Sequence, residues 1–357
     1  MAQAIQLARR GLYTTSPNPR VGCLIEQDGE LIGEGWHQWA GQGHAEVNAL
    51  ADAAGNSAAV NGATVYVTLE PCSHSGRTAP CADALIDAQV ARVVYGMEDP
   101  NPSVAGRGLQ RLRDAGIDVV GPLLEQQAQQ LNPGFCKRMS QQLPWVTVKM
   151  ASSLDGRTAM ASGESQWITG AAARADVQKL RARSCAVVTG IGTVLHDDPQ
   201  MTVRAVELGA QCHGQPLIRQ PLKVVVDSQG QLPGAANIRQ QPGELLAVTA
   251  GPQVDGVETR VMLGANGQVD LLALLQELAK RQCNEVLVEA GAELAGAFVA
   301  AGLVDQLVVY QAPCLLGSGA RPLLSLPIEK MDQQHKLDIQ DVRMIGEDMR
   351  ITALLRR

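Results

Sequence analysis

The amino-acid sequence predicts two α/β domains, at residues 1–143 and 144–357, and three observations lead to this fold class. The chain has 357 residues, which is more than one hydrophobic core normally supports. Short strand-like and helix-like segments alternate along both halves, as they do in layered α/β domains. Between the halves, Gln142-Leu143-Pro144 ends a helical pattern, and a strand-like pattern restarts directly after it.

The first half begins with a helical pattern over residues 2–11, which ends at Gly11. Residues 20–37 predict a β-hairpin, because Asp28-Gly29 is a typical two-residue turn between strands. The following patterns predict strands at 63–70, 91–97 and 117–123, and helices at 44–54, 81–89, 106–116 and 125–139.

The second half repeats the alternation with more strands. The patterns predict helices at 170–183, 271–281 and 292–302, and strands at 145–151, 185–190, 222–228, 245–250, 257–263, 285–291 and 305–313. Residues 336–355 predict an antiparallel hairpin at the end of the sheet. We therefore expect a second α/β domain built on a mixed sheet.

Composition and charge limit the possible partners. Hydrophobic residues make up 45% of the chain and charged residues 18%, as in globular proteins. A net charge of −6 gives the chain as a whole no attraction for nucleic acid. No stretch approaches the ~18 continuous apolar residues of a membrane span, and residues 1–19 lack the apolar core of a signal peptide. We therefore expect a cytoplasmic protein with neither a nucleic-acid nor a membrane partner.

Four residues of the first half have the chemistry of a zinc site. His44 and Glu46 begin the helix 44–54, Cys72 follows a predicted strand, and Cys81 begins the next helix. One histidine and two cysteines supply three zinc ligands and leave a fourth position for water, whose pKa zinc lowers to about 7. Glu46 can then shuttle protons without binding the metal. Each residue alone has an ordinary interpretation, as a helix cap, a dipole partner or a buried cysteine, but together they form the pattern of zinc nucleobase deaminases.

Two features of this pattern are unusual. Residues two apart lie on opposite sides of a regular helix, so His44 and Glu46 converge only if His44 lies in extended chain at the helix entrance. Gly43 permits such an entrance. In addition, eight residues separate Cys72 from Cys81, whereas the deaminase pattern is P-C-x-x-C.

Several segments together resemble the bifunctional deaminase/reductase family of riboflavin biosynthesis, namely TSPNPRVGCLI, GQGHAEVNAL, LEPCSHSGRTAPCADALI and KMASSLDGRTA. The resemblance extends over residues 2–357, and the long cysteine segment with HSGRTAPC is a specific mark of the family. It implies a three-layer, cytidine-deaminase-like fold for the first domain and a dihydrofolate-reductase-like α/β fold for the second. It also implies two reactions, a zinc-hydroxide deamination of a diaminohydroxy-phosphoribosylaminopyrimidine and then an NADPH reduction of the ribosyl group to ribityl.

For the first domain, the resemblance implies one zinc ion per chain, with Glu46 as the catalytic proton shuttle and with the metal ligands His44, Cys72 and Cys81. It implies contacts with the deaminase substrate by Asn18, His37, His74 and Arg77. An arginine suits the substrate phosphate, because its planar fork donates two hydrogen bonds. For each of these four residues an ordinary role in a loop is an equal alternative.

The second half contains two strand-to-glycine turns, VVTGIGTVL at 187–195 and LVEAGAELAGA at 287–297. Backbone N–H groups at the helix N-termini after such turns bind phosphate. Neither turn has the G-x-G-x-x-G pattern of a dinucleotide site, so each alone is better explained as a tight structural turn. Two such turns in one domain favour a dinucleotide cofactor.

The resemblance identifies this cofactor as NADPH. It implies cofactor contacts by Ala151, Trp167, Thr193, Asp197, Ser228, Gly291, Ala292, Glu293, Leu294, Ala295, Gly296 and Ala297. It implies contacts with the reductase substrate by Ser165, Arg181, Met201, Arg204 and Glu289. Two of these are arginines suited to a phosphate, although a surface charge is their ordinary alternative. The proton donor to the opening sugar ring stays open between Asp197, Glu289 and bound water.

Two other functions stay open at this point. The chain is alternatively a tRNA or nucleoside deaminase with a non-catalytic appended domain, although the cysteine spacing and the net charge of −6 argue against this. The second domain is alternatively a degenerate reductase that serves only in dimerisation or regulation, although both glycine turns are intact. The expected partners are small phosphorylated pyrimidines, and the resemblance suggests a homodimer formed through the second domain.

Overall fold

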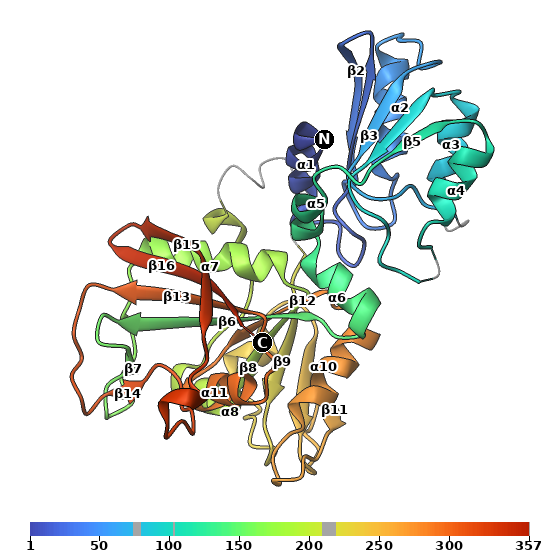
Figure 1. The fold of residues 1–357 in the computed structure, drawn as a ribbon. Coiled ribbons are helices and arrows are strands. Elements are labelled where there is room, and N and C mark those ends of the chain that lie inside the picture. Colours follow the sequence, from blue (N-terminus) through green and yellow to red (C-terminus); the bar gives the residue numbers. More distant parts are fainter. Residues whose placement is uncertain (74–79, 103, 209–218, 357) are drawn as a thin grey trace. The chain divides into compact units, whose positions relative to one another are not determined.

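The computed structural model describes residues 1–73, 80–102, 104–208 and 219–356 (Figure 1). The chain divides into two compact units, Met1–Gln142 and Leu143–Arg357. In the described ranges no helix is long and apolar enough to cross a membrane.

The first unit contains a five-stranded sheet in the order β2-β1-β3-β4-β5. Strands β1 and β2 form the predicted antiparallel hairpin, β1 also pairs antiparallel with β3, and β3, β4 and β5 are parallel. Asp28 and Gly29 have φ angles of 53° and 86°, as a turn of the type favoured by hairpins requires. The strands are β1 Gly22–Gln27, β2 Glu30–Trp36, β3 Thr64–Val67, β4 Arg92–Tyr95 and β5 Asp118–Val120.

Helices cover both faces of this sheet, which gives the three layers that the resemblance implied. On one face, α1 packs against Leu24, and on the other, α2, α3 and α4 share a core with its neighbours Cys23 and Ile25. Alternation of side chains along β1 therefore separates the two layers. The helices are α1 Ala2–Ala8, α2 Ala45–Gly55, α3 Cys81–Asp87, α4 Arg107–Asp114, α5 Glu125–Leu131 and α6 Pro133–Gln141, with a 3-10 turn at Arg9–Gly11.

The single helix predicted over 125–139 is wrong. The segment forms two helices, α5 and α6, which are separated at Asn132. Pro133 is the first residue of α6, because a proline has no N–H for a helix interior and its ring clashes with the preceding turn. The Asn132 side chain instead bonds both backbone groups of Arg20, at 2.8 Å each.

The second unit contains a nine-stranded sheet in the order β11-β10-β9-β8-β12-β6-β13-β16-β15. The strands from β11 to β13 are parallel, and the C-terminal hairpin β15–β16 adds two antiparallel strands, so the mixed sheet is confirmed. The strands are β6 Trp145–Ser153, β8 Ala186–Gly190, β9 Leu222–Val226, β10 Leu245–Thr249, β11 Glu258–Val261, β12 Glu285–Glu289, β13 Gln306–Ala312, β15 Leu337–Ile345 and β16 Asp348–Leu355.

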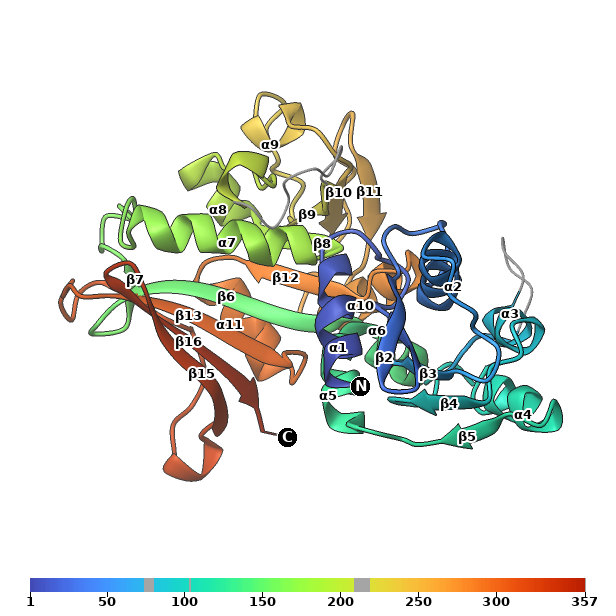
Figure 2. The same ribbon diagram turned by 90° about the horizontal axis from the view of Figure 1, so that it is seen from above.

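Helices also lie on both faces of the larger sheet (Figure 2). Helices α10 and α11 pack with Val188 and Val286, whereas α7 packs with Val308 on the opposite face. The remaining elements are the helices α7 Ala171–Arg183, α8 Ile191–Asp197, α9 Asn237–Gln240, α10 Leu271–Lys280 and α11 Ala292–Ala300, the 3-10 turns Ala205–Glu207 and Met331–Gln333, and a small sheet of β7 Arg157–Ala159 and β14 Arg321–Pro322.

Candidate active sites

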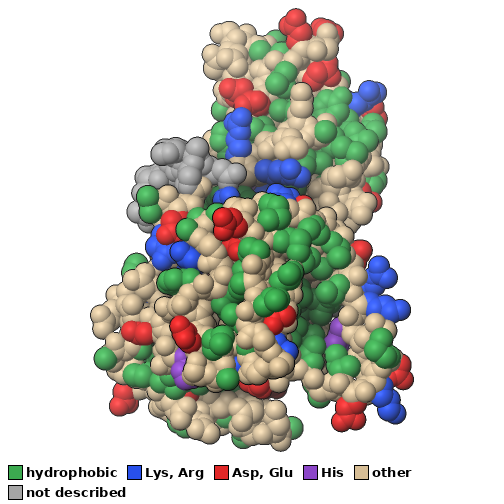
Figure 3. Space-filling model, turned by 90° about the vertical axis from the view of Figure 1, so that its left-hand side faces the viewer, with side chains coloured by type: hydrophobic (Ala, Val, Ile, Leu, Met, Phe, Trp, Pro, Cys, Tyr) green, Lys and Arg blue, Asp and Glu red, His purple; other side chains and the backbone are tan. Residues whose placement is uncertain are grey.

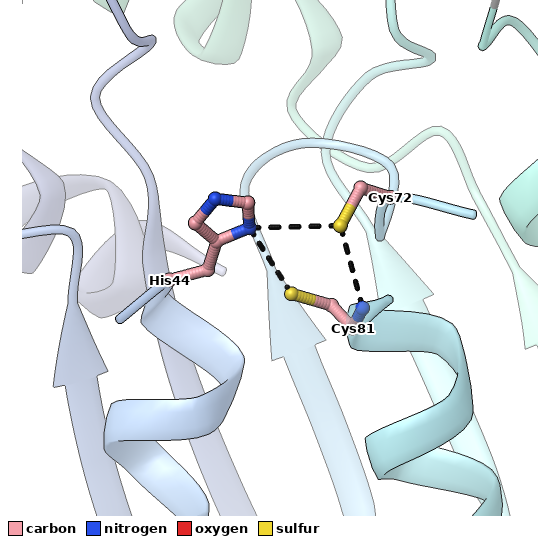
Figure 4. A group of neighbouring side chains, drawn as sticks. All are labelled: His44, Cys72 and Cys81. Atoms are coloured by element: carbon pink, nitrogen blue, oxygen red, sulfur yellow. Dashed lines mark hydrogen bonds between the residues drawn. The ribbon is translucent and has the colours of Figure 1, made fainter. Parts of the chain in front are cut away.

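Three potential metal ligands converge where α2 and α3 begin (Figure 4). His44 precedes the first residue of α2 with φ −73° and ψ 167°, so the extended entrance predicted for it is confirmed. Cys81 is the first residue of α3, and Cys72 lies in the segment between β3 and α3. The ligand atoms of the three residues all lie within 4.8 Å of one another.

The distances fit a zinc ion. His44 Nδ1 lies 3.2 Å from Cys81 Sγ and 3.6 Å from Cys72 Sγ. Tetrahedral zinc, at about 2.0–2.1 Å from nitrogen and about 2.3 Å from sulfur, separates two such ligands by about 3.6 Å. Hydrogen bonds from Cys81 and His44 lower the pKa of Cys72, and the same coupling raises the pKa of Cys81. The cluster therefore favours the thiolate form of Cys72, which is the form of cysteine that binds metal.

Glu46 lies in the first turn of α2 beside this cluster and is only 3% exposed. Burial raises the pKa of its carboxyl group to about 7. A carboxyl group with a pKa near neutrality can both accept and release a proton at physiological pH, as a proton shuttle requires.

Asn18 and His37 form the neighbouring wall of the site. His37 Nδ1 lies 3.0 Å from the Gly43 carbonyl oxygen, which can only accept, so Nδ1 carries the proton. His37 Nε2 therefore accepts from the Asn18 amide at 3.1 Å. The His37 ring also contacts the His44 ring edge-on, with 5.5 Å between centroids. The structure thus brings two predicted substrate contacts to the metal ligands.

The ends of the long cysteine segment are bonded to each other. The Cys81 N–H donates to Cys72 Sγ at 3.3 Å, and the Ala82 N–H donates to the Cys72 carbonyl oxygen at 3.1 Å. These bonds bring the two cysteines together whatever the intervening chain does. The predicted contacts His74 and Arg77 fall outside the described residues.

The second unit contains a cavity of about 1000 Å³ at the carboxyl ends of β6, β8 and β12. Ligands of open α/β sheets commonly bind at this edge. The cavity contains most of the residues predicted to contact cofactor or substrate, namely Ala151, Ser165, Trp167, Arg181, Thr193, Asp197, Met201, Arg204, Glu289, Gly291, Ala292, Glu293 and Leu294.

Four predicted cofactor contacts do not line this cavity in the described part of the chain. Ser228 instead bonds Gln268 at 2.9 Å, near the end of β9. Ala295 is fully buried in the core, and Gly296 packs so closely on Ser325 that a Cβ would lie 2.1 Å from the Ser325 carbonyl oxygen. Ala297 follows them in α11. The glycine turn therefore faces the cavity only over its first residues.

The arginines expected to bind phosphate are paired with carboxylates. Arg181 donates from Nε and Nη2 to the two oxygens of Glu289, at 2.6 and 2.9 Å. Arg204 Nε lies 2.6 Å from Glu207 Oε1. The forks of both arginines thus already hold a carboxylate, and an incoming phosphate would compete with it or use the remaining N–H groups.

Sequence reasoning missed Lys149, which lines the same cavity. Burial lowers the pKa of its ammonium group, and the neighbouring Glu289 opposes this shift. A lysine in the middle of the apolar strand pattern WVTVKMA was a detectable signal, because an unpaired lysine is costly in a core. Arg174, which stacks 4.5 Å over the Trp167 ring at the cavity wall, gave no comparable signal.

Both units match known protein families. Residues 144–351 match the family model described as the RibD C-terminal domain, and residues 1–97 match the cytidine and deoxycytidylate deaminase zinc-binding region. Riboflavin biosynthesis protein RibD of Escherichia coli is 53% identical over 98% of this chain and 96% of its own length, and that of Haemophilus influenzae is 46% identical over 99% and 95%. The solved structure of Acinetobacter baumannii RibD has a TM-score of 0.91 at 47% identity, covering 100% of this chain and 98% of its own.

Proposed function

Since the chain belongs to the RibD family of riboflavin biosynthesis proteins, we propose how its residues divide the deaminase and reductase activities of that family. The protein is a bifunctional enzyme of riboflavin biosynthesis. A Thermotoga maritima relative of known structure, 31% identical over 100% of this chain, is named a diaminohydroxyphosphoribosylaminopyrimidine deaminase and 5-amino-6-(5-phosphoribosylamino)uracil reductase. The family relationship does not favour the alternative of a nucleoside or tRNA deaminase with a non-catalytic appended domain.

We assign the deaminase to residues 1–143. The convergence of His44, Cys72 and Cys81 within 4.8 Å is the observation that supports this most directly, because one histidine and two cysteines are a typical ligand set of catalytic zinc. Zinc held by this set supplies a water molecule acidified to about neutral pKa. Glu46 would accept a proton at its carboxylate and deliver it to the departing amino group, and burial, which raises the pKa of this group to about 7, suits it to both steps.

Asn18 and His37 are proposed to orient the pyrimidine. The bond between the Asn18 amide nitrogen and His37 Nε2 directs Asn18 Oδ1 away from His37 and makes it an acceptor for an amino group on the ring. His37 in turn is fixed by Gly43, the residue before His44. One hydrogen-bonded chain thus links the substrate contact to the metal ligand.

We assign the reductase to residues 144–357, with NADPH as the nicotinamide cofactor. The cavity at the ends of β6, β8 and β12 lies beside Gly190 and Gly291, the residues that precede α8 and α11. Backbone N–H groups at these helix starts suit the cofactor phosphates. The proposed cofactor contacts are the cavity-lining residues Ala151, Trp167, Thr193, Asp197, Gly291, Ala292, Glu293 and Leu294.

The substrate is proposed to lie between Ser165, Met201 and the charged group of Arg181, Glu289 and Lys149. The cofactor supplies hydride, and the residues of this chain position the sugar and provide the proton for ring opening. Ser165 Oγ donates to Asp197 Oδ1 at 3.2 Å, so a proposed substrate contact and a proposed cofactor contact are bonded to each other on the cavity wall.

The second unit is also proposed to form a homodimer. Strand β15 is the edge of the large sheet, and one of its faces carries the exposed apolar side chains Leu337, Ile339, Val342 and Met344. Figure 3, which views the side where β15 and β16 lie in Figure 1, shows hydrophobic side chains gathered over part of that surface. An exposed apolar edge strand is a typical pairing surface. Sedimentation of the purified chain tests this, and a monomer at micromolar concentration would contradict it.

Metal analysis combined with an assay on the diaminopyrimidine ribosyl phosphate tests the assigned functions. We expect one zinc per chain, ammonia release without NADPH, and NADPH oxidation only after deamination. Activity on free cytidine with none on the pyrimidine phosphate would contradict the proposed substrate. Absence of NADPH binding by the full chain would leave residues 144–357 without the proposed reductase role.

A further inference from the structure

Two direct bonds join Cys72 to Cys81 and Ala82, and the wide spacing of the two cysteines raises the question of what else holds their chain segments in place. In compact zinc sites about two to four residues lie between paired ligands, so a single turn holds both. Here eight residues separate Cys72 from Cys81. The two chain segments that carry them, 70–73 and 80–83, both contact helix α4, which itself contributes no ligand.

Glu70 ties the first segment to α4. Its carboxylate is 3% exposed and accepts from four backbone N–H groups. Oε2 accepts from Asp99 at 3.1 Å and from Gly106 at 2.9 Å, and Oε1 accepts from Gly108 at 2.9 Å and from Leu109 at 3.4 Å. A carboxylate at the N-terminus of a helix satisfies N–H groups that have no partner within the helix and also interacts favourably with the helix dipole.

Gly108 allows the first segment to lie directly on α4. A Cβ at this position would lie 1.9 Å from the Pro71 carbonyl oxygen, so any side chain would force the two apart. Pro71 immediately precedes Cys72. The backbone of one metal ligand is therefore in contact with the first turn of the helix.

Arg111 joins the second segment to the same helix. Its Nε lies 2.6 Å from Asp83 Oδ1, and its Nη1 donates to the Ser73 carbonyl oxygen at 3.4 Å. Ser73 directly follows Cys72, and Asp83 lies in the first turn of α3, two residues after Cys81. One guanidinium group thus bridges the chain just after the first cysteine and just after the second.

We propose that Glu70 and Arg111 are positioning residues of the metal centre, which hold Cys72 and Cys81 at a fixed separation by tying both to α4. The proposal rests on the assignment of these cysteines as zinc ligands. Glu70 and Arg111 belong to neither the ligand cluster nor the substrate wall, so they act through the backbone that carries the ligands. Partners of metal ligands commonly affect affinity strongly, because an ion selects one ligand geometry.

The experiment uses the full-length chain with Glu70→Gln, Arg111→Gln and the matched control Arg113→Gln. Arg113 is an exposed arginine on the same helix, so its replacement changes the charge of α4 equally. Zinc affinity is measured by competition with a chromogenic chelator, and the ligand geometry is read from the visible spectrum of the Co²⁺-substituted protein. Deaminase kcat and KM are measured separately, and circular dichroism of the same sample reports on whether the variant is folded.

We expect Glu70→Gln to weaken zinc binding about 10- to 100-fold, since the amide offers one acceptor where the carboxylate satisfied four donors. Arg111→Gln should weaken it about two- to fivefold, as expected for a partly exposed ion pair. Both should alter the Co²⁺ spectrum at saturating metal and lower kcat more than they raise KM. Arg111→Lys should bind zinc more tightly than Arg111→Gln but less tightly than the unmodified chain. Lysine keeps the positive charge opposite Asp83 but not the bridge to Ser73.

Equal zinc affinity and equal Co²⁺ spectra in Arg111→Gln, Arg113→Gln and the unmodified chain would overturn the proposal. If Glu70→Gln fails to fold, the comparison of Arg111→Gln with Arg113→Gln decides alone. Zinc binding by the unmodified chain distinguishes failure of the positioning proposal from failure of the assigned function. If it binds no zinc, the ligand assignment is wrong; if it binds zinc and the variants match it, only the positioning role is wrong.

Discussion

Replacing Glu289 by glutamine is predicted to destabilise the second unit, because it breaks a buried ion pair on the cavity wall. Arg181 donates to both oxygens of Glu289, at 2.6 and 2.9 Å, and the two side chains are only 14% and 8% exposed. Lys149 lies close enough to Glu289 and Arg181 to interact electrostatically with both. The substitution therefore leaves two cations facing each other without their counter-ion.

The expected loss of stability follows from this geometry. Removal of one partner from a buried pair costs about 3–5 kcal/mol. Glutamine keeps the volume and one acceptor, and the cavity admits water, so we expect about 2–3 kcal/mol. For a unit of this size each kcal/mol lowers the midpoint of thermal unfolding by about 2–4 °C, which gives a decrease of about 4–12 °C.

The loss should also depend on pH. Burial lowers the pKa of Lys149 and Glu289 opposes this shift, so removing Glu289 lowers the pKa further. Between that lowered value and the ordinary lysine value of 10.5 the unfolded chain binds more protons than the folded chain, and stability rises with pH. The difference between the variant and the unmodified chain should therefore be smaller near pH 9.5 than at pH 7.

Thermal unfolding followed by near-ultraviolet circular dichroism measures this effect, with Glu207→Gln as the control. Glu207 pairs with Arg204 in the same cavity region, but their side chains are 29% and 46% exposed, so that variant should lose less than about 1 kcal/mol. If Glu289→Gln unfolds within 1 °C of the control, or if its loss does not shrink at high pH, the inference from burial is refuted.

Three further predictions concern single residues. Glu46→Gln should keep its zinc and lose about 10²- to 10⁴-fold in deaminase kcat, because an amide cannot shuttle a proton; retained turnover would identify another base. Cys81→Ala should lose zinc by metal analysis and keep most of its reductase rate, whereas loss of both activities would show that the units are coupled. Tyr310→Phe should lower the free energy of unfolding, measured in urea, by about 1.5–3 kcal/mol, because the buried Tyr310 hydroxyl donates to Asp176 at 2.7 Å. An unchanged midpoint would mean that Arg350 and Lys179 alone satisfy the Asp176 carboxylate.

Much of the fold could be predicted from sequence because its signals are local. The hairpin at Asp28-Gly29, the strand–helix alternation and the C-terminal hairpin all depend on residues near one another in the chain. The single helix predicted over 125–139 is wrong because Pro133 cannot lie inside a helix and instead begins a second one. The cluster of potential metal ligands was predictable for a different reason, since histidine and cysteine at element ends form a rare combination.

The supporting residues could not be predicted in this way. Glu70 accepts from N–H groups that lie 29 to 39 positions further along the chain, and Arg111 reaches Asp83 and Ser73 across a similar separation. Nothing in the local pattern around either residue distinguishes it from an ordinary charged side chain. Only the tertiary structure shows which donors meet a carboxylate, so contacts of this kind are found by geometry.

The two sites also differ in how far their chemistry constrains the sequence. A metal site depends on particular atoms, so one histidine, two cysteines and one carboxylate are enough to predict a zinc deaminase from a small part of the chain. Hydride transfer depends mainly on the placement of two large molecules, and many side chains can provide a wall for them. The lining of the cavity in the second unit accordingly extends from Lys149 to Pro322, and it includes residues as different as Ala151 and Trp167. This explains why weak glycine turns were the strongest local signal of the reductase, and why its charged group of Lys149, Arg181 and Glu289 emerged only in three dimensions.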